Sequence, residues 1–200
     1  MRLILVRHGE TNADSIRRYW GQSDVELSAI GLEQAEMLRR RLSSEKIDAI
    51  YTSTLKRASV TADIIASERK LAVTGCNELN EVDFGKIEGL TFEEISQRYP
   101  ELTKLWASWS LELAFPGGES FDDFNKRVVG FLDRLKKHTA EETVLVVGHG
   151  GPFRLLLCHL IGLSLKHWGQ FYFDLASVSV LETYNRGAVL CRLNDVAHLE

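Results

Sequence analysis

Two histidines stand directly beyond apolar runs that are typical of buried strands. His8 follows the run 3–6 and Arg7, and His149 follows the run 144–147. In an open α/β sheet, ligands sit in the crevice beyond the carboxyl ends of the strands, so residues far apart in sequence can meet over one ligand. A single histidine at such a place is more often structural. The pair is the first candidate for an active centre.

A third strand end brings a second arginine toward the same edge. Residues 48–52 are typical of a short strand, and Ser53 or Thr54 can cap the next helix, which carries Arg57 in its opening turns. The first turn of a helix offers N–H groups and the positive end of the dipole to an anion. Guanidinium groups bind phosphate through paired, charge-assisted hydrogen bonds. With Arg7 and Arg57 at one edge, the sequence predicts a phosphate site.

These residue types can transfer a phosphoryl group. The reaction needs an in-line nucleophile, cations around the phosphoryl oxygens and a proton for the leaving oxygen. A neutral imidazole can attack phosphorus when its other nitrogen donates to a fixed acceptor, and the backbone carbonyl just after His8 is a candidate acceptor. Arg7, Arg57 and His149 would stabilise the transition state, with His149 either protonated or acting as an N–H donor.

Glu81 is the best candidate for the general acid. It follows a short strand at 71–74 and precedes a turn at 83–85 that could aim its side chain into the crevice. A carboxylic acid there could donate a proton to the leaving oxygen and later take one from water. Three nearby carboxylates compete for this role on spacing alone: Glu78, Asp83 and Glu88.

Composition restricts the partners. The 200 residues are 44% hydrophobic and 26% charged, and the net charge of −4 gives no general attraction to nucleic acid or to an anionic membrane. The expected partner is a small phosphorylated metabolite that a local basic pocket attracts. The oligomeric state stays open, with a homodimer as one option.

Three scattered cysteines, Cys76, Cys158 and Cys191, form no C-x-x-C pair, and the last two lie among apolar residues. They are expected to be reduced core thiols, which suits the cytoplasm. The most apolar helix, 153–163, contains Arg154 and is too short for a membrane span. We expect a soluble cytoplasmic protein.

Strands that alternate with helices predict a three-layer αβα sandwich with a mostly parallel sheet. A hairpin around 185–187 should add antiparallel pairing at an edge. Residues 1–200 are expected to form one domain, and the excursion 84–120 departs from the repeating pattern. Its aromatic residues, which include Trp106 and Trp109, are expected either to form a lid over the strand ends or to form a small satellite core.

Five ordered motifs now support a resemblance. They are Arg7-His8-Gly9-Glu10-Thr11, Leu27-Ser28 with Gly31, Ser53-x-x-x-Arg57-Ala58-x-x-Thr61-Ala62, Leu79-Asn80-Glu81-x-x-Phe84-Gly85 and Val147-Gly148-His149-Gly150-Gly151. Together they resemble the histidine phosphatase superfamily, with its phosphoglycerate mutase-like fold. The resemblance implies that His8 is phosphorylated in the cycle and that Glu81 donates the proton. It also implies phosphoryl binding by Arg7, Arg57 and His149, with Gly150 beside them, and no cofactor or metal.

Within the superfamily, the segment 106–121 is similar to the α-ribazole phosphatases of cobalamin assembly. That similarity implies hydrolysis of α-ribazole 5′-phosphate, whose flat base Trp106 and Trp109 could stack upon. The chain departs from the family pattern at Asp14, where many members carry asparagine, and at Glu26, where they carry proline. A charge at Asp14 would repel phosphate if it pointed inward, so Asp14 stays outside the catalytic set.

Other functions remain open at this stage. A broad-specificity or fructose-bisphosphatase-like sugar phosphatase shares most of the motifs, and a phosphoglycerate mutase would pass the phosphoryl group between positions of its substrate. A zinc hydrolase could use His8, His149 and Glu81 as ligands, although no His-Glu-x-x-His helix is present. A phosphate-binding module without catalysis would be expected to lack the nucleophile or the acid.

Overall fold

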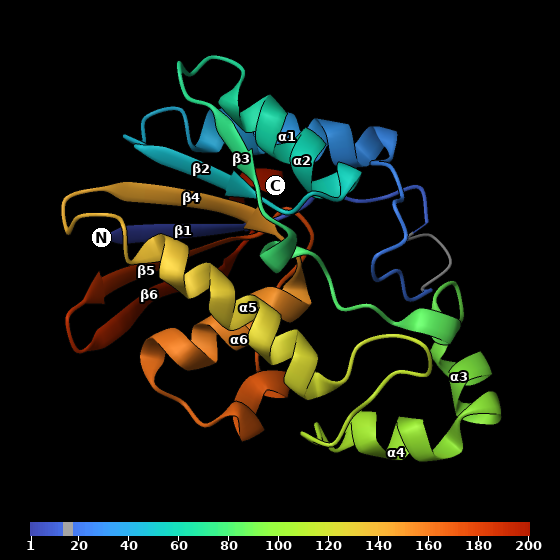
Figure 1. Cartoon of the computed structure of the whole chain (residues 1–200). Coiled ribbons are helices and arrows are strands. Elements are labelled where there is room, and N and C mark those ends of the chain that lie inside the picture. The colour runs from blue at the N-terminus through green and yellow to red at the C-terminus, as the bar shows by residue number, and fades with distance from the viewer. Residues whose placement is uncertain (14–17) are drawn as a thin grey trace.

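A mixed sheet of six strands forms the centre of the molecule (Figure 1). The computed structural model describes residues 1–13 and 18–200, so Asp14 lies outside the described residues. The strand order is β3-β2-β4-β1-β5-β6. The strands are β1 (Arg2–Arg7), β2 (Ala49–Thr52), β3 (Val73–Gly75), β4 (Thr143–Gly148), β5 (Val178–Tyr184) and β6 (Gly187–Asp195).

The first four strands of that order run parallel, and the last two form the antiparallel hairpin at one edge. β1 pairs with β4 from Arg2 opposite Thr143 to Arg7 opposite Gly148. That register places both strand ends, and therefore both histidines, at the same height on the sheet. The predicted mostly parallel sheet with antiparallel pairing at an edge is confirmed.

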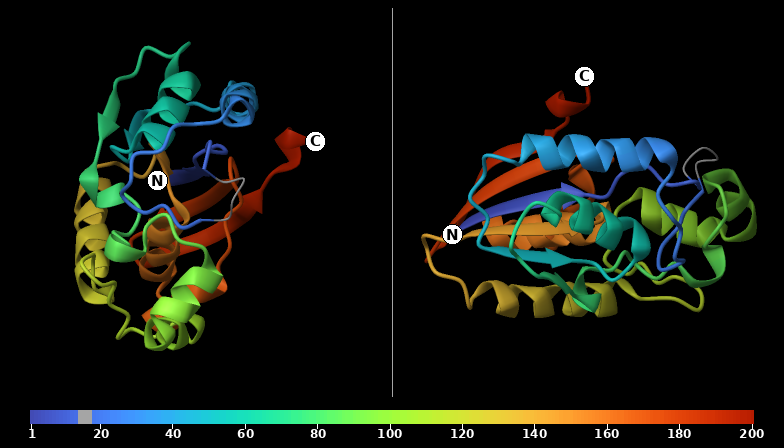
Figure 2. Two further views of the ribbon diagram at one scale, coloured as in Figure 1. Left: turned by 90° about the vertical axis from the view of Figure 1, so that its right-hand side faces the viewer. Right: turned by 90° about the horizontal axis from the view of Figure 1, so that it is seen from above.

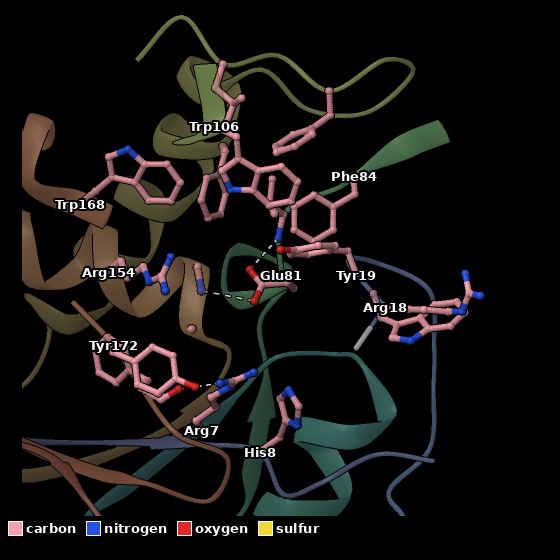
Figure 3. Close-up of a pocket in the computed structure, with 18 of the residues that line it drawn as sticks. Arg7, His8, Arg18, Tyr19, Glu81, Phe84, Trp106, Arg154, Trp168 and Tyr172 are labelled. Carbon is pink, nitrogen blue, oxygen red and sulfur yellow. Dashed lines mark hydrogen bonds between the residues drawn. The ribbon is translucent and has the colours of Figure 1, made fainter. Parts of the chain in front are cut away.

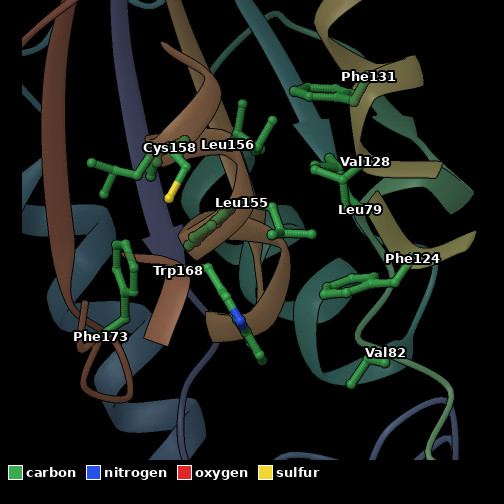
Figure 4. Close-up of a cluster of buried hydrophobic side chains, with 14 of the residues drawn as sticks. Leu79, Val82, Phe124, Val128, Phe131, Leu155, Leu156, Cys158, Trp168 and Phe173 are labelled. Atoms are coloured by element: carbon green, nitrogen blue, oxygen red, sulfur yellow. The ribbon is translucent and has the colours of Figure 1, made fainter. Parts of the chain in front are cut away.

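Helices cover both faces of the sheet (Figure 2). α1 (Ala29–Arg41) and α2 (Lys56–Ala66) pack on the face to which Ile4 and Val6 of β1 point. α5 (Phe121–Leu135) and α6 (Gly150–Ile161) pack on the opposite face, against Leu3 and Leu5 (Figure 4). Successive side chains of a strand point to opposite faces, so a strand buried on both faces must be apolar at every position. This arrangement confirms the three-layer αβα sandwich.

Serine side chains cap two helices of the sandwich, and one predicted cap is absent. Ser28 caps α1 and Ser120 caps α5, each accepting the backbone N–H of the third residue along. α2 begins later than expected, after Leu55, and has no side-chain cap. The predicted cap by Ser53 or Thr54 is therefore wrong, and the side chain of Ser53 is used elsewhere.

The excursion 84–120 lies beyond the carboxyl ends of the parallel strands (Figure 1). It contains η3 (Gly85–Ile87), α3 (Phe92–Arg98) and α4 (Pro100–Ala107). Its two ends are joined where the backbone of Gly85 lies against Gly118: a Cβ at Gly85 would lie 2.4 Å from the Gly118 nitrogen, and Gly85 has a φ of +55°. Ile95 and Leu102 pack into the same core cluster as α5 and α6.

Three short 3-10 helices complete the described chain: η2 (Asn77–Leu79), η4 (Leu165–Gln170) and η5 (Ala197–Leu199). Cys76 and Cys158 are buried as expected, whereas Cys191 is exposed on β6 and corrects the prediction that it is a core thiol. Across the described residues, none of the helices has the length and apolar character needed to span a membrane.

Candidate active site

A cavity of about 500 Å³ opens where the predicted residues converge, at the carboxyl ends of the parallel strands (Figure 3). Seven of the residues singled out from the sequence line it: Arg7, His8, Arg57, Glu81, Trp106, Trp109 and Gly150. His149 is fully buried and does not line the cavity wall, but its ring lies edge-on to that of His8, with 5.0 Å between the ring centres.

The His8 ring is oriented for attack by one nitrogen. Its Nδ1 lies 2.7 Å from the carbonyl oxygen of Gly9, which can only accept, so Nδ1 carries the proton and Nε2 has the lone pair. The predicted acceptor just after His8 is confirmed. Burial lowers the pKa of His8 well below its ordinary value, and the charges of Arg57 and Arg7 lower it further. The imidazole is therefore neutral near pH 7.

Ser53 determines which nitrogen of His149 carries a proton. The amide oxygen of Asn80 accepts the backbone N–H of Thr54 at 2.9 Å, which fixes the orientation of that amide. Ser53 Oγ lies 2.8 Å from the same oxygen and 2.8 Å from Nε2 of His149. The single hydroxyl hydrogen must point to Asn80, because two oxygens at 2.8 Å without a hydrogen would repel each other. His149 Nε2 therefore donates to Ser53.

The other nitrogen of His149, Nδ1, is buried and has no hydrogen-bond partner among the described residues. Burial lowers the pKa of His149 well below its ordinary value, and the charge of Arg57 lowers it further. His149 is thus neutral with a lone pair on Nδ1, rather than protonated. A phosphate oxygen can hydrogen-bond to this atom only when a proton lies between them.

The two arginines are anchored by backbone carbonyls. Arg57, from the first turn of α2, is 2% exposed and donates to Ser23 O at 2.9 Å and to Gly21 O at 2.6 Å. Arg7 donates through Nη1 to Phe173 O at 2.5 Å. Neutral acceptors fix the direction of each guanidinium without cancelling its charge.

The anion expected at the N-terminus of α2 is supplied by the protein itself. The Lys56 N–H, the first of the helix, donates to Asp24 Oδ1 at 2.7 Å. The helix whose N-terminus reaches the cavity is α6, through Gly150 and Gly151. This corrects the sequence interpretation of which helix end faces the site.

Glu81 is the one of the four candidate carboxylates that lines the cavity. Its Oε1 accepts from Val82 N at 3.0 Å and its Oε2 from Gly151 N at 3.3 Å. It lies across the cavity from Arg7 and His8 (Figure 3). The other three candidate carboxylates make contacts outside the cavity lining. Glu78 pairs with Arg134, Asp83 accepts from Gly85 N, and Glu88 accepts from the backbone N–H groups of Gln22 and Ser23.

Arg127 on α5 holds the Glu81 loop in place, a role that was not predicted. Its guanidinium forms a bidentate pair with Glu119, at 2.7 and 2.8 Å, and donates to Glu81 O at 3.2 Å. It also donates to the carbonyls of Asn77, Glu78 and Asn80. Glu119 also accepts from Asp83 N at 3.0 Å. Arg127 and Glu119 together therefore join the loop that carries Glu81 to the end of the excursion.

Aromatic side chains form the outer wall of the cavity. Trp106 packs against Tyr19, Phe84 and Phe115, with ring centres 4.6 to 5.4 Å away. The ring of Trp109 meets Trp168 edge to face at 5.5 Å, and the guanidinium of Arg154 lies 5.6 Å from its centre. The excursion therefore lines the cavity and packs into the main core cluster rather than a separate one. That it acts as a lid stays a prediction.

Several lining residues were not predicted: Arg18, Tyr19, Arg154, Trp168 and Tyr172. A signal existed for Arg154, because it interrupts the most apolar helix of the chain and lies one turn after Gly150, on the same helix face. No comparable signal marks Tyr19 or Tyr172.

The remaining sequence hypotheses concern metal and two unusual acids. Among residues 1–13 and 18–200, no cluster of three or more His, Cys, Asp and Glu side chains could hold a metal ion, so the zinc-hydrolase alternative gains no support. Glu26 is exposed and pairs with Lys56 at 3.3 Å, outside the cavity lining. Asp14 is not among the described residues.

The buried histidines make stability depend on pH. Below pH 6.5 an unfolded chain protonates His8, whereas the folded protein keeps it neutral, so the unfolded state binds more protons and stability falls with acid. Between pH 7 and pH 5 this loss amounts to as much as about 2 kcal/mol. We expect His8→Gln to weaken the pH dependence of the free energy of unfolding by about that amount. Urea titrations at both pH values measure it, with the exposed His167→Gln as the control. Equal pH dependence in wild type and His8→Gln would contradict the expectation.

Comparison with known proteins gives a consistent result. Residues 3–196 match the model of the histidine phosphatase superfamily (branch 1). Phosphoserine phosphatase 1 of Hydrogenobacter thermophilus is 39% identical over 199 residues, which cover 100% of this chain and 94% of that protein. The adenosylcobalamin/alpha-ribazole phosphatase of Escherichia coli is 36% identical over 199 residues, covering 98% of this chain and 97% of that protein. The crystal structure of the alpha-ribazole phosphatase from Shigella flexneri superposes with a TM-score of 0.89 at 34% identity, covering 98% of this chain and 96% of that one.

Proposed function

Because the chain belongs to the histidine phosphatase superfamily and is a phosphatase, we propose that it hydrolyses phosphomonoesters through a phosphohistidine formed on His8. The observation that carries the proposal is the tautomer of His8. The Gly9 carbonyl holds the proton on Nδ1, which leaves Nε2 as a neutral nucleophile beside two carbonyl-anchored arginines.

In the first step, Nε2 of His8 attacks phosphorus in line with the leaving oxygen, and the P–O bond to the alcohol breaks. Arg7 and Arg57 balance the charge on the phosphoryl oxygens. Glu81, on the opposite side of the cavity, gives its proton to the leaving alkoxide, so the alcohol departs neutral.

In the second step, the Glu81 carboxylate takes a proton from water, and the resulting hydroxide attacks phosphorus. The P–N bond breaks, inorganic phosphate leaves, and both His8 and Glu81 return to their starting protonation states. The contacts of Glu81 with the N–H groups of Val82 and Gly151 keep the carboxyl group in one place for both transfers.

Two leaving groups have support. The aromatic wall with Trp106 and Trp109 favours α-ribazole 5′-phosphate, in line with the relative from Escherichia coli. The cation of Arg154 favours phosphoserine, in line with the relative from Hydrogenobacter thermophilus. Both substrates would place their phosphate at His8 and differ only in the outer half of the cavity.

Hydrolysis should continue without a metal, because the imidazole supplies the nucleophile, the arginines stabilise the phosphoryl charge and the carboxylic acid supplies the proton. We expect dialysis against EDTA to leave the release of inorganic phosphate from p-nitrophenyl phosphate, phosphoserine and α-ribazole 5′-phosphate within about twofold of the untreated enzyme. The panel includes 3-phosphoglycerate, whose conversion to an isomer without phosphate release would reveal mutase activity instead. Activity that EDTA abolishes and a divalent ion restores would overturn the mechanism.

A further inference from the structure

Arg154 is a cation in the wall of the cavity that forms no ion pair with any described residue. Its Nε is buried without a hydrogen-bond partner, and its guanidinium makes no hydrogen bond or ion pair with any described residue. The guanidinium instead lies over the face of Trp109. Burial lowers the pKa of the guanidinium, which shows that its charge is held in a poorly solvated place. A buried charge of this kind normally has a partner.

The charges that line the cavity are unbalanced. Among the residues that the structure describes, four arginines line it, Arg7, Arg18, Arg57 and Arg154, against one carboxylate, Glu81. Arg18 pairs with Glu94 at 2.8 Å. Arg7 and Arg57 line the cavity with His8, where the proposed function places the phosphoryl group. Glu81 enters the proposed reaction as the protonated acid, so it supplies no negative charge while substrate is bound; it accepts from two backbone N–H groups and makes no ion pair with Arg154 among the described residues. The charge of Arg154 is therefore left for the rest of the substrate.

We propose that Arg154 binds a carboxylate of the leaving group, so that the preferred substrates are phosphomonoesters of small hydroxy acids. This rests on the proposed function, because it assigns the outer half of the cavity whose inner half holds the phosphoryl group. Arg154 lies across the cavity from His8, beside Glu81 and Tyr172 (Figure 3). A carboxylate one or two carbons from the phosphoester oxygen would reach the guanidinium while that oxygen faces Glu81.

A flat neutral base fits this wall less well. The guanidinium of Arg154 already lies over the ring of Trp109, and the ring of Trp168 meets it nearly at a right angle. An aromatic leaving group would also desolvate the guanidinium without supplying a counterion, which is unfavourable. A carboxylate would instead form charge-assisted hydrogen bonds with the guanidinium.

The test uses two substrates that differ by one carboxylate, O-phosphoserine and O-phosphoethanolamine. We expect wild type to prefer phosphoserine by about 10- to 100-fold in kcat/KM, the range for hydrogen bonds to a charged group. Arg154→Gln should reduce that ratio to within about threefold, and Arg154→Lys should restore part of it. The pair 3-phosphoglycerate and glycerol 1-phosphate should behave in the same way.

Arg18→Gln is the matched control, because Arg18 lines the same cavity but has Glu94 as its partner. Arg18→Gln should change kcat/KM for both substrates of a pair by the same factor. The wild-type ratio requires no variant, so the test stands even if Arg154→Gln does not fold. An equal kcat/KM for both members of each pair would overturn the carboxylate subsite. A second result would also overturn the carboxylate subsite: a wild-type preference for α-ribazole 5′-phosphate over phosphoserine that is lost in Arg154→Gln. That result would indicate that the base stacks on the guanidinium. No phosphate release from any substrate, p-nitrophenyl phosphate included, would instead contradict the proposed function.

Discussion

Replacing His8 with alanine is expected to stop turnover of every phosphomonoester while the protein remains folded. The loss should be on the order of 10⁴-fold or more in kcat. Among the described residues that line the cavity, His8 alone presents a neutral nucleophilic nitrogen next to Arg7 and Arg57. The ring itself contributes little to the core, since its neighbours are His149 and the Gly9 carbonyl rather than an apolar cluster. Circular dichroism and a thermal melt check the fold.

The covalent intermediate provides the direct measurement. Wild-type enzyme quenched during turnover of ³²P-labelled substrate should retain label that is stable in alkali and lost in acid, and His8→Ala should retain none. His167→Ala, at an exposed ring, should label like wild type. Label at another residue in wild type, or ordinary turnover by His8→Ala, would remove His8 as the nucleophile.

The second large effect should follow from replacing the acid by its amide. Glu81→Gln is expected to lower kcat for alkyl phosphates by about 10²- to 10⁴-fold, because an alkoxide leaves poorly without a proton. The loss for p-nitrophenyl phosphate should be much smaller, since nitrophenolate departs as an anion. The ratio of the two losses is the measurement, and it separates proton donation from a general disturbance of the site.

Glu78→Gln is the control for that measurement. Glu78 belongs to the same loop but pairs with Arg134 and does not line the cavity. Its substitution should affect alkyl and nitrophenyl substrates by one common factor. If Glu81→Gln did the same, Glu81 would be holding the structure of the site rather than donating a proton.

The strand ends of the site could be predicted because buried strands have a simple sequence pattern. β1 and β4 are covered on both faces, so they are uniformly apolar, and the first polar residues after them must lie at the edge of the sheet. The parallel register then brings His8 and His149 together. Glu81 was harder to identify: its loop has no periodicity, and the resemblance separated it from its rivals.

The positioning groups could not be found in this way. Ser53 looked like a helix cap, and only the folded structure shows its hydroxyl between Asn80 and His149. Arg127 occupies an ordinary position on an amphipathic helix, where most arginines are solvated. In both cases the partners lie on other elements, so no local pattern records them.

Cys191 shows a related failure. Its apolar neighbours suggested a core position, but β6 is an edge strand that is partly uncovered, and Val189 on the same strand is 55% exposed. Alternate residues of an edge strand can be apolar without being buried. The number of apolar residues in a strand therefore could not distinguish a central strand from this one.

The Arg127 contacts have a consequence for efforts to change the substrate. Five N–H groups of one guanidinium, one of them shared between carbonyls, make six contacts that set the spacing between the Glu81 loop and the end of the excursion. A library that randomised Arg127 or Glu119 would shift the proton donor along with the wall, and most of its members would lose chemistry before they gained a new specificity. Mutagenesis confined to Trp106, Trp109 and Arg154 would reshape the outer cavity and leave that spacing intact. The most productive library is thus the one that leaves Arg127 and Glu119 unchanged.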